Sequence, residues 1–188
     1  MDVSGYRGSW ARYGSGGGWL SRAWTLGQSL RPAAAATGQL MVIGTPTFEP
    51  WHVAAHLDDE ARRSGLPSLR PTLLRWQPPA SAPAHLRHSV EELRRAGRRH
   101  TVLVVATAIM DADVLERLAD AHRRGAALMA ITAGDDELTS MTDESVTVGP
   151  WRTEDVGSDD FEIATHVVSV SAGTLQRRRW RKSRVESL

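Results

Sequence analysis

The sequence contains no cysteine among its 188 residues. This absence excludes disulfides, thiolate nucleophiles, zinc ribbons and iron–sulfur clusters, although sites built from histidine and carboxylates stay open. A membrane-spanning helix needs about 18 uninterrupted apolar residues, and no run of apolar residues in the sequence is close to this length. The first 30 residues carry charged side chains and a glycine run where a signal peptide requires a continuous apolar segment. We therefore expect a cytoplasmic protein without a membrane span.

Common signatures of catalysis and nucleotide binding are missing as well. The chain has no G-x-S-x-G nucleophile elbow, no Walker loop and no G-x-G-x-x-G motif. Hydrophobic residues make up 41% and charged residues 24% of the sequence, which excludes a disordered, collagen-like or coiled-coil protein. The length suits one domain with a core and is too short for two full-sized ones.

Charge is unevenly distributed, although the net charge is only +1. Residues 135–162 hold ten acidic side chains against one arginine, whereas residues 177–184 hold six basic ones around Trp180. We expect a flexible glycine-rich lead-in over residues 1–18, one domain over residues 19–174 and a basic tail over residues 175–188. A solvated terminus is the favoured interpretation of the tail. The alternative is contact with nucleic acid or another anionic surface through residues 177–184, since arginine binds phosphate and tryptophan stacks on bases.

Short apolar runs alternate with longer amphipathic stretches after Gly38, which is typical of strands joined by crossover helices. The candidate strands are residues 40–43, 72–76, 101–106, 127–131, 146–148 and 166–170. We expect an N-terminal helix from residue 19 to about 36, with its regular part ended by Pro32, and a helix over residues 48–64 that ends at Gly65. Two further helices are expected. The capping box Ser89/Glu92 begins the helix over residues 90–96, and the capping box Asp113/Glu116 begins the helix over residues 114–124, which ends at Gly125.

The runs TVLVVA and ALMAI are almost entirely apolar, as the central strands of a parallel sheet are. We therefore predict an α/β fold with three αβα layers around a mostly parallel, flavodoxin-like, five-stranded sheet. Whether residues 151–174 complete the sheet stays open.

The segment over residues 125–148 carries a family pattern: GAALMAIT, a short loop, then LTSMTDESVTV. It is similar to the G-A-x-V-I-A-I-T and L-A-x-x-A-D motifs of the sugar isomerase (SIS) domain, which is found in phosphoheptose isomerases and in the isomerase half of glucosamine-6-phosphate synthase. The resemblance extends from about Trp19 to Pro150. The chain also resembles, in length, a small bacterial family of unknown function with SIS-like architecture. The resemblance implies a domain that binds a sugar phosphate and forms a homodimer.

SIS domains hold the sugar phosphate in loops rich in serine, threonine and glycine, where N–H groups at helix starts face the anion. In this sequence the matching loops retain only part of that pattern. The positions that would contact a ligand are Gly44, Thr45, Thr47, Thr107, Asp111 and Thr132.

Asp111 and Asp113 follow the predicted central strand, at positions where the family has phosphate-binding residues. Two unit charges about 4 Å apart at an effective dielectric near 20 repel by about 4 kcal/mol. We therefore expect a degenerate phosphate site. Two other interpretations of these acidic residues remain open, namely the general preference for Asp and Glu in the first turn of a helix and a site for a divalent cation.

Three side chains near the first loop are candidates for chemistry. An isomerase would use Glu49 or His52 as its general base. His52 and His56 are four residues apart on a predicted helix, a spacing that suits zinc. Their segment HVAAHL resembles the H-x-A-A-E-L of a zinc site in some phosphoheptose isomerases, but His56 replaces the glutamate and the sequence shows no counterpart of the C-terminal helix that supplies the other ligands. We expect ordinary helix histidines, no metal and no other cofactor.

The leading hypothesis is a non-catalytic module that binds a sugar-phosphate-like ligand or another carbohydrate derivative, or that regulates through it. One alternative is a sugar-phosphate isomerase, and another is association with an anionic partner through the basic tail. Trp19 and Trp24, on the predicted N-terminal helix, are candidates for a homodimer interface because aromatic residues are enriched at subunit contacts.

Overall fold

The computed structural model describes residues 18–83, 87–148 and 158–174, so the predicted basic tail and nearly all of the predicted lead-in lie outside the described residues. Five strands form one sheet in the order β2-β1-β3-β4-β5, and every neighbouring pair is parallel. The strands are β1 (Gln39–Ile43), β2 (Pro71–Leu74), β3 (His100–Ala106), β4 (Ala127–Thr132) and β5 (Glu144–Thr147). This strand order is that of flavodoxin-like folds, so the predicted fold class is confirmed.

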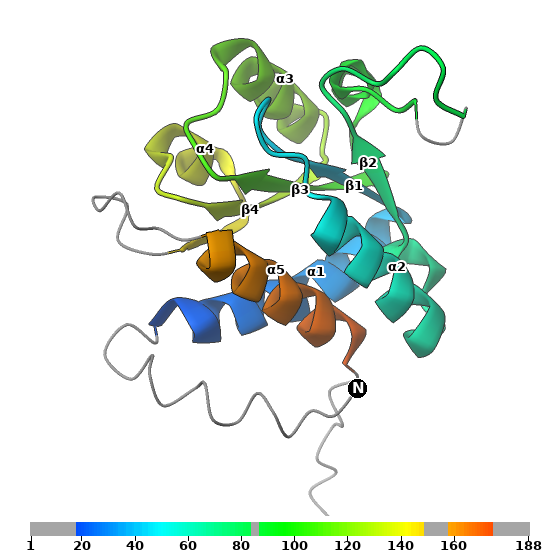
Figure 1. Ribbon diagram of the computed structural model, residues 1–188, viewed down its shortest axis with the longest axis vertical. Coiled ribbons are helices and arrows are strands. Elements are labelled where there is room, and N and C mark those ends of the chain that lie inside the picture. Colours follow the sequence, from blue (N-terminus) through cyan, green and yellow to red (C-terminus); the bar gives the residue numbers. More distant parts are fainter. Residues whose placement is uncertain (1–17, 84–86, 149–157, 175–188) are drawn as a thin grey trace, which may run out of the picture.

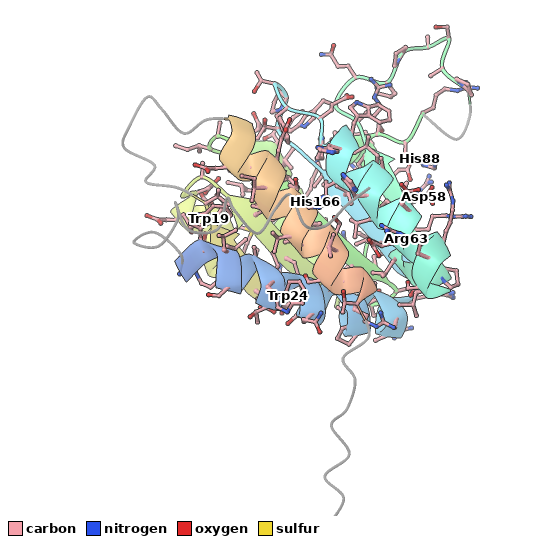
Figure 2. The ribbon with its side chains drawn as sticks, turned by 60° about the horizontal axis from the view of Figure 1, so that its bottom comes forward. Trp19, Trp24, Asp58, Arg63, His88 and His166 are labelled. Atoms are coloured by element: carbon pink, nitrogen blue, oxygen red, sulfur yellow. The ribbon has the colours of Figure 1, made fainter. Side chains whose placement is uncertain are left out.

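Helices cover both faces of the sheet (Figure 1). One face carries α1 (Gly18–Thr37), α2 (Trp51–Ser64) and α5 (Ser158–Gly173), and α5 lies between the other two (Figure 2). The other face carries α3 (Ala112–Arg123), α4 (Asp136–Met141) and the 3-10 helix η5 (Val90–Arg95). A second 3-10 helix, η3 (Pro67–Leu69), precedes β2. The predicted three layers are therefore present.

The core divides into two apolar clusters, one on each face of the sheet. Along β3, Leu103 and Val105 belong to the cluster beneath α1, α2 and α5, whereas Val102 and Val104 belong to the cluster beneath α3. All four side chains are fully buried. This alternation follows from the two-residue period of a strand, and it explains why a strand covered on both faces is apolar throughout.

Two glycines end helices as predicted. Gly65 follows α2 with φ 66°, and its N–H bonds the carbonyl of Ala61. Gly125 follows α3 with φ 89°, and its N–H donates to the carbonyl of His122. Both backbones are left-handed, a conformation that glycine adopts without the steric cost of a Cβ atom.

The predicted strand over residues 166–170 is wrong, because these residues lie within α5. The three valines of this segment are β-branched and therefore typical of a strand, but the packing of α5 against α1 and α2 decides the conformation. The hydroxyls that would otherwise be buried without partners bond back within the helix, Ser169 Oγ to the His166 carbonyl at 2.9 Å and Ser171 Oγ to the Val168 carbonyl at 3.0 Å. At Gly27 of α1 the two helices are so close that a Cβ atom would lie 1.9 Å from Ser171 Oγ.

Pro32 does not end the N-terminal helix, which continues to Thr37. Leu26, Leu30 and Ala34 are completely buried on its inner side. Burial of a leucine side chain contributes about 1.5–3 kcal/mol, and this packing offsets the cost of about 3 kcal/mol of a proline inside a helix.

Both predicted capping boxes are wrong in detail. Residues 90–95 form a 3-10 helix without a side-chain bond from Ser89, and Glu92 instead pairs with Nδ1 of His88 at 2.8 Å. At α3 the capping residue is Asp111, whose carboxylate accepts from the N–H of Asp113 at 2.9 Å. Among the described residues, no helix combines the length and the apolar character needed to cross a membrane.

Candidate functional site

The carboxyl ends of β1 and β3 define the expected ligand crevice. β1 lies next to β3 in the sheet, but β1 leads into α2 on one face and β3 into α3 on the other. Ligands of open parallel sheets bind at such a reversal of strand order. The loop after β4 lies beside that after β3, since the N–H of Ala133 donates to the carbonyl of Ala106 at 2.9 Å.

The predicted ligand residues of the first loop serve partly to fold it. Thr45 is buried, and its Oγ1 lies 3.4 Å from Oγ1 of the exposed Thr47. The carbonyl of Gly44 accepts a hydrogen bond from Nε1 of Trp76 at 2.9 Å, and a Cβ atom at this glycine would lie 2.0 Å from the carbonyl oxygen of Phe48. In this loop Thr47 therefore offers the more accessible hydroxyl.

The predicted ligand residues of the other two loops differ in the same way. Thr107 is half-buried after β3. Thr132 is fully buried after β4, and its Oγ1 accepts from the N–H groups of Gly134 at 3.1 Å and Asp135 at 3.0 Å. Thr132 therefore shapes its turn, and Thr107 keeps a partly exposed side chain at the crevice.

Carboxylates bind the N–H groups at the starts of both helices that follow these loops. Asp111 caps α3 from an exposed position through the N–H of Asp113. Asp135 is only 5% exposed and accepts from the N–H of Leu138 at 3.0 Å through Oδ1 and from the N–H of Met110 at 2.8 Å through Oδ2. One buried carboxylate thus caps α4 and also ties the loop after β3 to it, in the place where an anionic ligand would need free donors.

Glu49, the candidate general base, is part of an ion pair. Nε of Arg75 lies 3.1 and 3.0 Å from its two carboxylate oxygens, and Nη2 lies 3.0 Å from Oε2. Both side chains are about four-fifths buried, at 23% and 18% exposed. Nε1 of Trp51 donates to the same carboxylate at 2.8 Å. These contacts occupy Glu49 with the structure of the chain itself.

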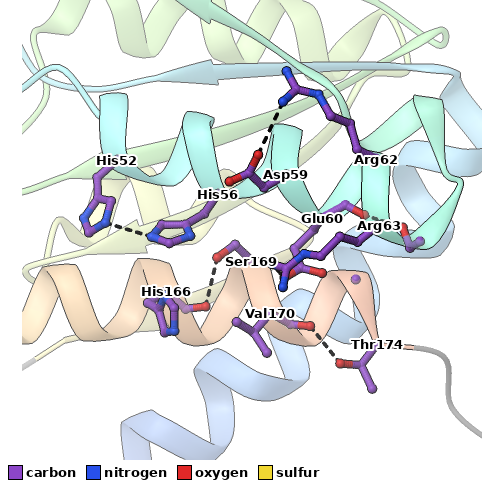
Figure 3. Close-up of polar contacts among 12 residues, drawn as sticks. His52, His56, Asp59, Glu60, Arg62, Arg63, His166, Ser169, Val170 and Thr174 are labelled. Atoms are coloured by element: carbon purple, nitrogen blue, oxygen red, sulfur yellow. Dashed lines mark hydrogen bonds and ion pairs between the residues drawn. The ribbon is translucent and has the colours of Figure 1, made fainter. Parts of the chain in front are cut away.

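The candidate metal pair is part of a group of three histidines on α2 and α5 (Figure 3). Nε2 of His52 lies 2.8 Å from Nε2 of His56, so a hydrogen bond joins the two rings. His166 of α5 lies edge-on to His56, with 4.7 Å between ring centroids. Contrary to expectation, the chain has a C-terminal helix near this pair, namely α5, which contributes His166. Within the described ranges, no group of three or more histidine or carboxylate side chains is arranged to hold a metal ion.

Two of the three histidines, His56 and His166, have lowered pKa values. Burial lowers the pKa of His56 below its ordinary value of 6.5, His166 and His52 lower it further, and Asp59 partly opposes the shift. Burial also lowers the pKa of His166, with additional contributions from His52 and Arg63. Both effects have the expected sign, since a buried site and neighbouring positive charge disfavour imidazolium.

An open hollow lies at the opposite end of the sheet from the crevice, beside the start of β4. Its volume is about 480 Å³, and it is lined by Ala33, His122, Gly125, Ala126, Ala127, Met129 and Asp143. The lining is mainly apolar and contains none of the predicted ligand residues. The hollow therefore does not belong to the candidate site.

Arg75 and Trp51 are not among the site residues predicted from the sequence, and His166 lies in a segment that was predicted to be a strand. Arg75 is 26 residues from the Glu49 that it binds, so no local spacing links the pair. His166 lies seven residues before Gly173, the last residue of α5. The available signal was the length of this segment, since a run of 16 residues is compatible with a helix.

No protein-family model matches the sequence, and no curated protein matches it. Solved structures do match. The sugar isomerase domain of an RpiR transcription factor from Sphaerobacter thermophilus is 14% identical with a TM-score of 0.54, and the match covers 79% of this chain and 76% of that one. The NanR protein of Vibrio vulnificus, solved in complex with ManNAc-6P, is 13% identical with a TM-score of 0.53, and the match covers 79% of this chain and 52% of NanR.

A proposed phosphosugar isomerase from Silicibacter pomeroyi DSS-3 is 16% identical with a TM-score of 0.54, over 83% of this chain and 43% of that one. The match thus spans about half or less of the last two proteins. The chain has the fold of the sugar isomerase domain, as its sequence pattern suggested.

Proposed function

We propose that the protein is a non-catalytic module that binds a carbohydrate derivative at the carboxyl ends of β1 and β3. The fold supports this proposal, because related folds include a protein solved with a sugar phosphate. Thr47 follows β1 and Thr107 follows β3, and parallel sheets bind ligands where the strand order reverses, as it does between these two strands; this supports a ligand contact at both threonines. Hydroxyl groups of this kind bond sugar hydroxyls without requiring a charged ligand.

One observation favours a degenerate phosphate site over an ordinary one. The carboxylate of Asp135 already bonds the N–H groups of Met110 and Leu138 at 2.8 and 3.0 Å. A phosphate group at the same place would find these N–H donors occupied and would face a negative charge. Two like unit charges about 4 Å apart repel by about 4 kcal/mol at an effective dielectric near 20. This repulsion corresponds to a loss in affinity of close to a thousandfold. We therefore assign the ligand's recognition to its sugar part.

Thermal unfolding in the presence of matched ligands tests this function. Glucose, glucosamine and N-acetylglucosamine would be compared with their 6-phosphates, and inorganic phosphate alone would serve as the anion control. A ligand at 100 times its dissociation constant stabilises the folded state by about 2.7 kcal/mol, which raises the midpoint by about 5–11 °C for a chain of this size. We expect each sugar that binds to give at least as large a shift without its phosphate as with it. A shift seen only with the 6-phosphates contradicts the degenerate site, and no shift with any sugar contradicts the function.

The isomerase alternative requires a free base near a sugar C–H bond. Glu49 is held by Arg75 and Trp51, and His52 is bonded to His56. Absence of aldose–ketose conversion of these 6-phosphates, followed by NMR, is the expected result. Conversion that is lost on Glu49→Gln would establish the alternative instead.

Three further parts of the proposal rest on the sequence. A cytoplasmic location follows from its composition, and pairing of two copies follows from the family resemblance. Trp24, which is 44% exposed on α1, is available for such a contact, whereas Trp19 is 8% exposed. Binding of nucleic acid through residues 177–184 stays a prediction about residues outside those described.

A further inference from the structure

Trp51 is a large apolar side chain held in an exposed position. It begins α2, directly after the loop that contains Thr47, and it is 44% exposed. Within the described part of the chain, the other exposed large apolar side chains are Trp24, which is also 44% exposed, and Ile109, which is 78% exposed. The exposed part of the indole is available for contact with a ligand.

Two contacts fix the orientation of the Trp51 ring. Its Nε1 donates to Oε2 of Glu49 at 2.8 Å, and the guanidinium carbon of Arg75 lies 4.9 Å from the ring centroid. The hydrogen bond holds the N–H edge of the indole against Glu49, and the cation–π contact holds the guanidinium of Arg75 over the ring. The indole is therefore ordered before any ligand arrives.

The partner residues are anchored in turn. The N–H of Arg75 donates to the carbonyl of His88 at 2.9 Å, and its own carbonyl accepts from the N–H of Val90 at 3.0 Å. Its side chain pairs with Glu49 through two nitrogens. A site whose groups are already ordered loses little conformational entropy when it binds.

We propose that Trp51, with the ion pair of Glu49 and Arg75 beside it, is a platform for the sugar ring of the ligand. This inference rests on the proposed function and specifies which part of the ligand is recognised. The flat, C–H-rich face of a pyranose covers an indole, and the guanidinium of Arg75 can donate to a ring hydroxyl through N–H groups that do not bond Glu49. Because the charges of Glu49 and Arg75 compensate each other, the platform selects a sugar ring without net charge at this position.

The test compares two equally exposed tryptophans. Trp51→Ala removes the platform, and Trp24→Ala is its matched control, since both side chains are 44% exposed and Trp24 lies on α1, across α5 from α2 (Figure 2). Dissociation constants for the uncharged sugars glucose and N-acetylglucosamine would be measured by calorimetry. We expect Trp51→Ala to weaken binding about tenfold or more, and Trp24→Ala to leave it unchanged.

A label on the ring keeps the test decisive if Trp51→Ala folds poorly. In the wild-type chain containing 5-fluorotryptophan, the ¹⁹F resonance of Trp51 is identified by its loss in Trp51→Phe, and that of Trp24 by its loss in Trp24→Phe. Addition of a sugar that binds should shift the first resonance and not the second. If a sugar binds while the Trp51 resonance stays in place, or if both alanine variants bind equally, the platform is wrong and the proposed function stands. If none of the sugars binds the wild-type chain, both are wrong.

Discussion

Replacing Asp135 with alanine removes the carboxylate that joins the loops after β3 and β4. The variant loses the cap of α4, which is typically about 0.5–2 kcal/mol, and leaves the N–H of Met110 without its partner in a buried position, which costs about 1–3 kcal/mol. The expected loss in the free energy of unfolding is therefore about 1.5–5 kcal/mol. For a chain of this length the melting midpoint should fall by about 3–20 °C. Asp135→Asn keeps one acceptor oxygen and should lose about half as much.

Chemical and thermal unfolding followed by circular dichroism would measure this loss. The matched control is Asp136→Ala, which removes an exposed carboxylate one residue later and should change stability by less than about 0.5 kcal/mol. Hydrogen exchange adds a local measurement, because the amides of Met110 and Leu138 should lose protection in Asp135→Ala. If the two alanine variants are equally stable, or if the Met110 amide exchanges at its wild-type rate, the described role of Asp135 is incorrect.

Two further predictions concern α5. Gly27→Ala places a Cβ atom 1.9 Å from Ser171 Oγ and should cost about 1–3 kcal/mol by overpacking, whereas Gly18→Ala, with no atom within 4 Å, should cost much less; denaturant unfolding of both variants decides this. The pKa values of His56 and His166 lie below 6.5 in the folded chain, so the unfolded chain binds more protons in the interval beneath that value. The contribution of these two histidines to the free energy of unfolding is therefore fully present above about pH 6.5, and it is lost as the pH falls towards the folded pKa values. A pH series should show this slope, and it should flatten in the His56→Asn/His166→Asn variant; equal slopes would contradict the assignment.

Much of the fold could be predicted because buried parallel strands leave a direct mark on the sequence. TVLVVA became β3 and ALMAIT became β4, since strands covered on both faces need apolar residues at every position. Gly65 and Gly125 marked helix ends because their backbones are left-handed. Residues 166–170 could not be assigned correctly, because their β-branched residues favour a strand and only the packing of α5 against α1 and α2 makes them helical.

The candidate site was less predictable. Its loops could be located, since they follow the strands, but the partners of its side chains come from distant segments. Glu49 was a plausible general base until Arg75 was found bonded to it from the end of β2. Asp135 lies three residues after the end of β4, but its bond to the N–H of Met110 spans 25 residues. Local spacing carries no information about such contacts.

The pairing of α1 with α5 has a consequence for biosynthesis. Nη1 of Arg31 bonds the carbonyls of Ala172 at 3.2 Å and Gly173 at 3.1 Å, so the first described helix is secured by the last. While the ribosome is still producing the middle of the chain, the apolar side of α1 has no cover, and a nascent polypeptide in that state is prone to aggregation. Closure of the domain must therefore wait until Gly173 has emerged from the exit tunnel.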